Sequence, residues 1–281
     1  MGDNGQGSSN GGGGGTQRKP SNQTNLSVLQ ALARKNTAGA DQQLADEIEK
    51  IVRTTKITKS DQDKGDTQKF FNATGMSDRK PKLVKTEMDL EDEINAGNQN
   101  QDFPYYIFHG DMASSTAQAD GFVKQFQGKS AQYISSGRLG DGTYFTTSPL
   151  GGTSYLDGRG FGQQSKAILN SNAKVVDDFH LSKMISLFQQ THPKAYTQIM
   201  KMQGGKNGRW GGDSKKSVFA TLFGYNAIID GRGPKAYDHY VSVFDRSALT
   251  VVTGKTTNYT ELFDRMVYDR SPWQYTNPNE N

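Results

Sequence analysis

The sequence predicts an α+β fold: a disordered tail, a small helical N-terminal region and a larger domain of short strands and helices. Three observations support this prediction. Residues 1–25 are dominated by glycine, serine, asparagine and glutamine. Apolar residues then recur at helical spacing over the following segment. From Phe103 onward, short apolar runs bounded by glycine alternate with a few helical patterns, which is typical of α+β domains. We therefore divide the chain into residues 1–25, 26–100 and 101–281.

The tail includes five consecutive glycines, Gly11–Gly15. A segment of this composition buries too little apolar surface to offset the entropy that it loses on ordering. We therefore expect it to be disordered.

Short helices are expected in the N-terminal region that follows the tail. One covers residues 25–35 and a second covers residues 41–55, each with leucine or isoleucine along one face. Asp41 stands where an N-cap of the second helix is expected. Residues 56–80 are mostly polar and indicate a linker, and a third helix is expected over residues 86–94. The apolar content of this region is too low for a large core. The region is either a packing arm, an interaction segment or a pair of helices lying on the following domain.

The larger domain holds most of the aromatic residues. Alternating and β-branched patterns predict short strands over residues 105–108, 143–146, 165–169, 174–176, 227–229, 240–244 and 249–252. Apolar residues at helical spacing predict helices over residues 112–127, 181–202 and 214–223.

Composition excludes several classes of protein. The chain has no cysteine, which excludes disulfide scaffolds, thiolate catalysis and cysteine-bound zinc. The four histidines are too scattered for a dedicated metal site. No window approaches eighteen apolar residues, so we expect no membrane span. The first fifteen residues lack the apolar segment of a signal peptide. These features favour action in the cytoplasm, or delivery into a host cell without a cleaved signal peptide.

The charge distribution argues against nucleic acid as a partner. The net charge is +4, and the first 100 residues contain 14 basic and 14 acidic side chains. The whole excess therefore falls in the remainder of the chain, where it favours an anionic ligand. It is too weak and too dispersed for a nucleic-acid surface, which needs clustered basic residues.

Three segments of the larger domain carry a recognisable combination of residues. An apolar strand ends in His109 and Gly110, a glycine turn leads into a strand that carries Tyr144, and a run of small residues ends at Tyr155. In their order and spacing these segments resemble the ADP-ribosyltransferase superfamily, in the branch of diphtheria toxin and the poly-ADP-ribose polymerases. Residues 224–230 and 240–245 also resemble the late strands of that family.

The resemblance implies a split, mixed sheet with a nicotinamide cleft between its two halves and NAD as the substrate. It assigns the side chain of His109 to the adenosine-side ribose and the backbone of Gly110 to the nicotinamide carboxamide. Tyr144 and Tyr155 would stack on the nicotinamide ring, where each aromatic contact adds about 1 kcal/mol. In short strands, however, tyrosines are also ordinary core residues.

The sequence departs from the family at the catalytic carboxylate. The family has a glutamate at the start of the strand that matches residues 240–244, and this chain has none there. The nearest candidates are Asp238 and His239. Successive strand residues point to opposite faces, so both can enter one cleft only if a bulge intervenes. A carboxylate here would stabilise the positive charge that develops on the ribose.

The leading hypothesis is therefore an ADP-ribosyltransferase-like protein that binds NAD and transfers ADP-ribose to a macromolecular acceptor, expected to be a protein. A toxin domain or a virion-borne protein would suit this activity. The alternative is a catalytically inactive module of the same fold with a binding or structural role, for example in a phage particle. A transferase of this fold acting on an RNA 2′-phosphate fits less well, because Arg138 and Arg159 lack the context that such enzymes need.

Overall fold

The computed structural model describes residues 24–57, 65–112, 135–147, 162–203, 215–230 and 239–253. Nearly all of the expected tail lies outside these ranges, as do Tyr155, Asp238 and almost all of the helix expected over residues 112–127. Within the described residues, α-helices and a mixed sheet form the α+β architecture that the sequence predicts.

The helices comprise α1 (Leu26–Ala33), α2 (Ala38–Thr54), α3 (Gly65–Ala73), α4 (Glu87–Asn95), α7 (Asp178–Thr191), α8 (Pro193–Lys201), α9 (Lys216–Phe223) and the 3-10 helices η2 (Met76–Asp78) and η6 (Arg246–Ala248). The strands comprise β1 (Lys82–Val84), β2 (Ile107–Met112), β3 (Ser135–Gly137), β4 (Gly140–Thr146), β5 (Gly162–Leu169), β6 (Val175–Asp177), β7 (Ala227–Ile229), β8 (Tyr240–Val243) and β9 (Leu249–Val252).

Helix α2 begins earlier than its sequence pattern indicates. Its N-cap is Thr37, whose side chain accepts a hydrogen bond from the backbone N–H of Ala40. The prediction of Asp41 as the N-cap is therefore wrong. Asp41 is buried one turn inside α2, where its carboxylate accepts hydrogen bonds from the backbone N–H groups of Lys194 and Ala195. It thus caps α8, which has no side-chain cap of its own.

The prediction of a linker over residues 56–80 is also wrong. Helix α3 and the short η2 occupy much of this segment, and the adjacent side chains of Phe70 and Phe71 are fully buried. The ring of Phe71 stacks on that of Phe244, with centroids 6.5 Å apart. Two neighbouring phenylalanines supply the apolar surface that this otherwise polar segment needs to fold onto the sheet.

The single helix expected over residues 181–202 is two helices that meet at His192. Pro193 occupies the first turn of α8, where its missing N–H costs no hydrogen bond, but it cannot continue α7. His192 is buried at this elbow, and its ring stacks on Phe188 with centroids 4.6 Å apart. Its Nε2 donates to the carbonyl of Lys35, 3.0 Å away, and so fixes the elbow against the end of α1.

The strands form one sheet in the order β1-β9-β5-β2-β4-β8-β7-β6, with β3 paired to β4. The outermost pairs, β1 with β9 and β6 with β7, are parallel, and the pairs between them are antiparallel. Strand β1, which no sequence pattern indicated, comes from the N-terminal region and is followed by α4.

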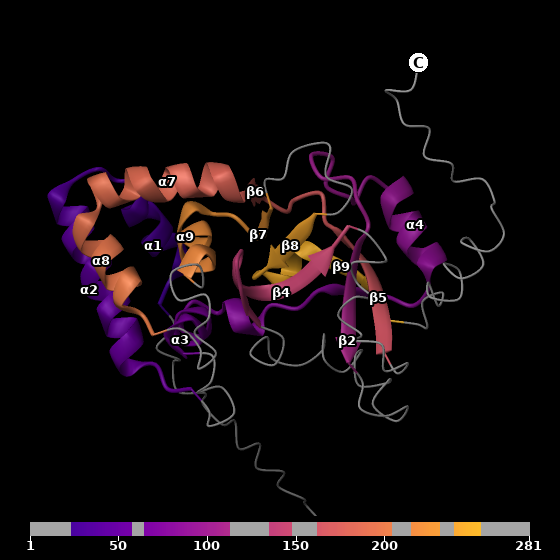
Figure 1. The fold of residues 1–281 in the computed structure, drawn as a ribbon, viewed down its shortest axis with the longest axis horizontal. Helices are drawn as coiled ribbons and strands as arrows, with labels where there is room; N and C mark the ends of the chain where they lie inside the picture. Colours follow the sequence, from indigo (N-terminus) through magenta and orange to yellow (C-terminus); the bar gives the residue numbers. More distant parts are fainter. Residues whose placement is uncertain are drawn as a thin grey trace, which may run out of the picture.

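The sheet consists of two halves that are joined at one point. Strands β2 and β4 share a single register pair, Phe108 with Thr146. By contrast, β2 pairs with β5 over six residues and β4 pairs with β8 over four. The first half is β1-β9-β5-β2 and the second is β4-β8-β7-β6. In Figure 1, β2 and β5 run across the direction of β4.

The two halves share a core on one face, which we call the inner face. Its cluster includes Ile107 and Leu249 from the first half and Phe145 and Val241 from the second. Helix α4 packs on the other face of the first half. Helices α1–α3 and α7–α9 gather at the opposite end of the molecule and cover the other face of the second half (Figure 1).

The N-terminal helices pack into the same cluster as the later ones. Leu44 and Ile48 of α2 belong to this cluster with Ile199 of α8 and Phe219 of α9.

Of the helices in the described ranges, none is long and apolar enough to cross a membrane.

Candidate functional site

His109 lies where the two halves of the sheet join. It directly follows Phe108, the residue of β2 that pairs with Thr146 of β4. Because Ile107 points to the inner face and alternate strand residues share a face, His109 also points to the inner face. Its half-buried imidazole packs against the ring of Phe145, with centroids 5.4 Å apart. Gly110 comes next on β2 and pairs with Gln164 of β5.

The imidazole of His109 bridges the two strands where their register pairing ends. Its Nδ1 lies 2.6 Å from the carbonyl oxygen of Tyr144. A carbonyl only accepts, so Nδ1 must carry the proton, and in the neutral ring Nε2 carries the lone pair. The backbone of β4 therefore sets the tautomer of His109.

Tyr144 comes from the neighbouring strand, but its side chain points to the opposite face from His109. Its phenol donates to the carbonyl of Gly140 at 2.7 Å and accepts from the N–H of Leu139 at 3.0 Å. Its ring packs against the helical cluster. Gly137 is required beside it, because a Cβ there would lie 2.4 Å from the phenol oxygen. The structure thus brings the two residues to adjacent strands without placing their rings together.

His239 lies next to the end of β4. Its N–H donates to the side chain of Thr147 at 2.9 Å, and its carbonyl accepts from the N–H of Thr147 at 3.0 Å. Because it stands two residues before Val241, its side chain is on the inner face, as that of His109 is. Its ring centroid lies 6.3 Å from that of Tyr105.

Asp230 is a member of this site that sequence reasoning missed. Its side chain is 2% exposed, and its Oδ1 lies 3.3 Å from Nδ1 of His239 and 3.1 Å from the N–H of Tyr240. The carboxylate orients the imidazole so that Nε2 can accept a proton or a hydroxyl hydrogen bond. The available signal was an acidic residue directly after the buried strand β7.

We call His109, Gly110, Tyr144, His239 and Asp230 the junction site. The other two residues predicted for it, Tyr155 and Asp238, lie outside the described residues. Within the part of the chain that the structure describes, no group of three or more histidine or acidic side chains is arranged to hold a metal ion.

Comparison of the chain with protein-family models, with curated proteins and with solved structures found no match.

Proposed function

We propose that this protein is an ADP-ribosyltransferase-like protein that binds NAD at the junction site and transfers ADP-ribose to a protein acceptor. The main support is that the two halves of the sheet share one residue pair, directly beside His109. The imidazoles of His109 and His239 lie on the inner face near this pair, whereas the side chain of Tyr144 lies on the opposite face. The reaction would take place in the cytoplasm, either of the protein's own cell or of a host cell that receives it.

The proposed reaction breaks the bond between ribose C1′ and the nicotinamide nitrogen. The bonding electron pair leaves with nicotinamide, and positive charge develops on the ribose, as in glycoside hydrolysis. A nucleophile of the acceptor then forms a bond to C1′ and gives up its proton. In the proposal, Nε2 of His239 takes the proton and Asp238 stabilises the ribose cation, which requires a bulge between the two residues so that both face the cleft. Asp230 would stabilise the imidazolium that results.

The binding step depends on His109 and Gly110. Nε2 of a neutral His109 accepts a hydrogen bond from a ribose hydroxyl, because the Tyr144 carbonyl holds the proton on Nδ1. The backbone of Gly110, which carries no side chain, allows the carboxamide to approach closely.

The test is calorimetric NAD binding combined with nicotinamide release and transfer of labelled ADP-ribose to proteins of a cell lysate. We expect His109→Ala to weaken NAD binding at least tenfold. Asp238→Asn should abolish release while NAD still binds. The matched control is His180→Ala, since His180 is exposed on α7 and should be dispensable. Absence of saturable NAD binding at millimolar concentration would contradict the proposal.

A second candidate is a catalytically inactive module of the same fold with a binding or structural role. The internal contacts of Tyr144 favour this candidate. Its phenol hydrogen-bonds Gly140 and Leu139 and its ring packs in the helical cluster, which is a structural role rather than a role in NAD binding. In that case Tyr144→Ala would lower the melting temperature without changing NAD affinity, and no nicotinamide would be released. Release that depends on Tyr144 would instead exclude the inactive module.

A further inference from the structure

A second region, separate from the junction site, contains a cavity of about 580 Å³. It lies between the start of α1, the turn from α3 to η2, the end of α9 and the turn that precedes η6. It shares no residue with the junction site. Its volume is within the usual range for small-molecule sites in proteins.

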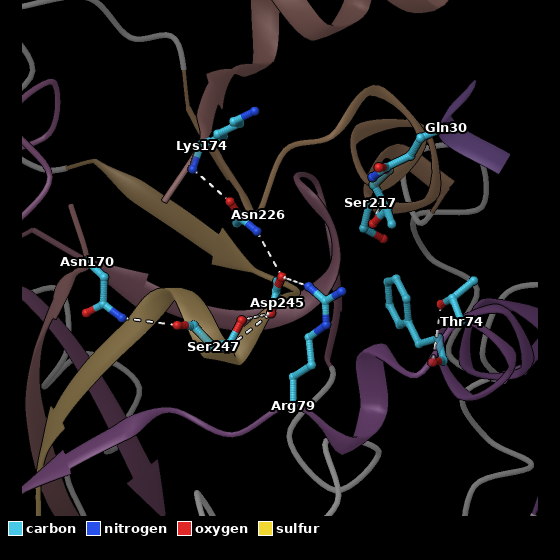
Figure 2. Close-up of polar contacts among 11 residues, drawn as sticks. Gln30, Thr74, Arg79, Asn170, Lys174, Ser217, Asn226, Asp245 and Ser247 are labelled. Carbon is cyan, nitrogen blue, oxygen red and sulfur yellow. Dashed lines mark hydrogen bonds and ion pairs between the residues drawn. The ribbon is translucent and has the colours of Figure 1, made fainter. Parts of the chain in front are cut away.

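A buried carboxylate organises one wall of this cavity. Asp245 is 1% exposed, and each of its oxygens receives two donors. Oδ1 accepts from the N–H of Ser247 at 3.1 Å and from its hydroxyl at 2.6 Å. Oδ2 accepts from Asn226 Nδ2 at 2.8 Å and pairs with Nη1 of Arg79. Figure 2 shows these contacts converging on Asp245. Its acceptors are thus occupied, and Asp245 serves to position Arg79 and Asn226.

Arg79 is the cation that this arrangement presents to the cavity. Its side chain is 39% exposed, and Asp245 is its only ion-pair partner among the described residues. The guanidinium has five N–H donors, so the edge formed by Nε and Nη2 can bind a second oxyanion in a bidentate manner. Figure 2 shows the outer nitrogen of Arg79 pointing away from Asp245.

The remaining wall is formed largely by neutral polar side chains. Gln30 donates from Nε2 to the carbonyl of Thr221 at 2.8 Å, which fixes its amide at the cavity. Because Asp245 is buried with its acceptors occupied, the partly exposed guanidinium of Arg79 is the charge that a ligand in the cavity would contact, which favours an anion.

We propose that this cavity binds a small polyhydroxylated oxyanion, either a sugar phosphate or a sugar acid, with Arg79 contacting the oxyanion directly. The hydroxyl and amide groups of the wall hydrogen-bond the hydroxyl groups of the ligand. A lone phosphate would leave most of the volume empty. The proposal does not depend on NAD binding at the junction site.

The experiment titrates the full chain with ribose 5-phosphate, gluconate and neutral ribose by calorimetry. We expect saturable binding of ribose 5-phosphate if the ligand is a sugar phosphate, or of gluconate if it is a sugar acid. Neutral ribose should not bind at the same concentration. Arg79→Lys keeps a cation beside Asp245 but removes the planar fork, and it should weaken anion binding at least tenfold. Arg53→Lys, at an exposed position of α2, is the matched control and should bind as the unmodified protein does.

A second variant covers the case in which Arg79→Lys does not fold. Gln30→Glu places a negative charge at the cavity and should also weaken anion binding at least tenfold. NAD binding should be the same in both variants as in the unmodified protein, so the two proposals can fail separately. The cavity proposal is overturned if neither anion binds, if ribose binds equally well, or if these variants bind the anion with unchanged affinity.

Discussion

Buried polar side chains hold together segments that are far apart in the sequence. Asp41 caps α8 from within α2, and Asp66 accepts a hydrogen bond from the N–H of Gln203 at 2.7 Å. Asp245 fixes Arg79 against the turn before η6. Each of these carboxylates accepts hydrogen bonds from a donor on a distant segment. Leaving such a buried group without its partner typically costs about 1–3 kcal/mol. The sequence could not indicate these roles, because each partner lies more than a hundred residues away.

Asp41→Ala should lower the free energy of unfolding by about 1–2 kcal/mol, because two backbone N–H groups at the start of α8 lose their acceptor. Urea denaturation measures this change. Asp46→Ala is the matched control, since Asp46 lies on the same helix and, among the described residues, its side chain is bonded only to the exposed Gln42. Equal losses in the two variants would show that Asp41 does not cap α8.

The candidate site was partly predictable at this scale. His109 and Gly110 were identified because they follow an apolar run in the sequence, and the structure places them within β2, at the junction of the two halves. The direction of the Tyr144 side chain was not predictable, because it depends on the turn that its phenol binds. Asp230 was missed because its role is to contact His239, and the two residues become neighbours only when β7 and β8 pair.

Helices and strands with a regular apolar pattern were the elements that the sequence predicted best. Helix α2 shows isoleucine and leucine at helical spacing, and β7, β8 and β9 fall close to their expected positions. Helix α3 was missed because its apolar surface is concentrated in Phe70 and Phe71 rather than spread along a face. Those two residues contribute to the core only through partners on other elements, such as Phe244.

Phe71→Ala should lower the free energy of unfolding by about 3–5 kcal/mol, because it leaves a cavity between α3 and the end of β8. Guanidinium denaturation measures the change. Phe179→Ala is the matched control, since Phe179 is 60% exposed on α7 and its loss should cost less than about 0.5 kcal/mol. A small loss in Phe71→Ala would mean that α3 does not belong to the core.

Helix α4 should weaken in acid. Hydrogen bonds from the backbone and side chain of Thr86 lower the pKa of Asp89, which completes the capping box of this helix. A carboxyl group whose pKa is lower in the folded state stabilises the fold above its unfolded pKa, about 3.9. This contribution is lost as the pH falls through the folded pKa.

Hydrogen exchange of the α4 amides between pH 5 and pH 2.5, corrected for the intrinsic pH dependence of exchange, tests this expectation. The protection of α4 should fall as Asp89 protonates. In Asp89→Asn, which cannot titrate, this pH dependence should be reduced. Retention of the full pH dependence in that variant would assign the effect to another group.

At the scale of the whole molecule, the order of the strands could not be predicted from sequence patterns. Strand β1 pairs with β9, although the two strands are far apart in the sequence, and β2 lies between β5 and β4. Such pairings depend on contacts between distant segments, which periodicity does not encode. The split, mixed character of the sheet was expected only from the family resemblance.

The shared helical cluster predicts that the N-terminal helices and the sheet unfold together. Ile48 of α2 and Ile228 of β7 belong to the same buried cluster. Their amides should therefore exchange with closely similar free energies of opening, and circular dichroism should show one urea transition. Two separate transitions would instead show that residues 26–100 fold independently of the sheet.

The most direct test of the central proposal is an NAD titration followed by NMR of the histidine side-chain nitrogens. If NAD binds at the junction of the two halves, the Nε2 signal of His109 should shift in a saturable manner while the signals of His180, exposed on α7, remain in place. An unchanged His109 signal at saturating NAD, or a saturable shift confined to the other histidines, would contradict the proposal.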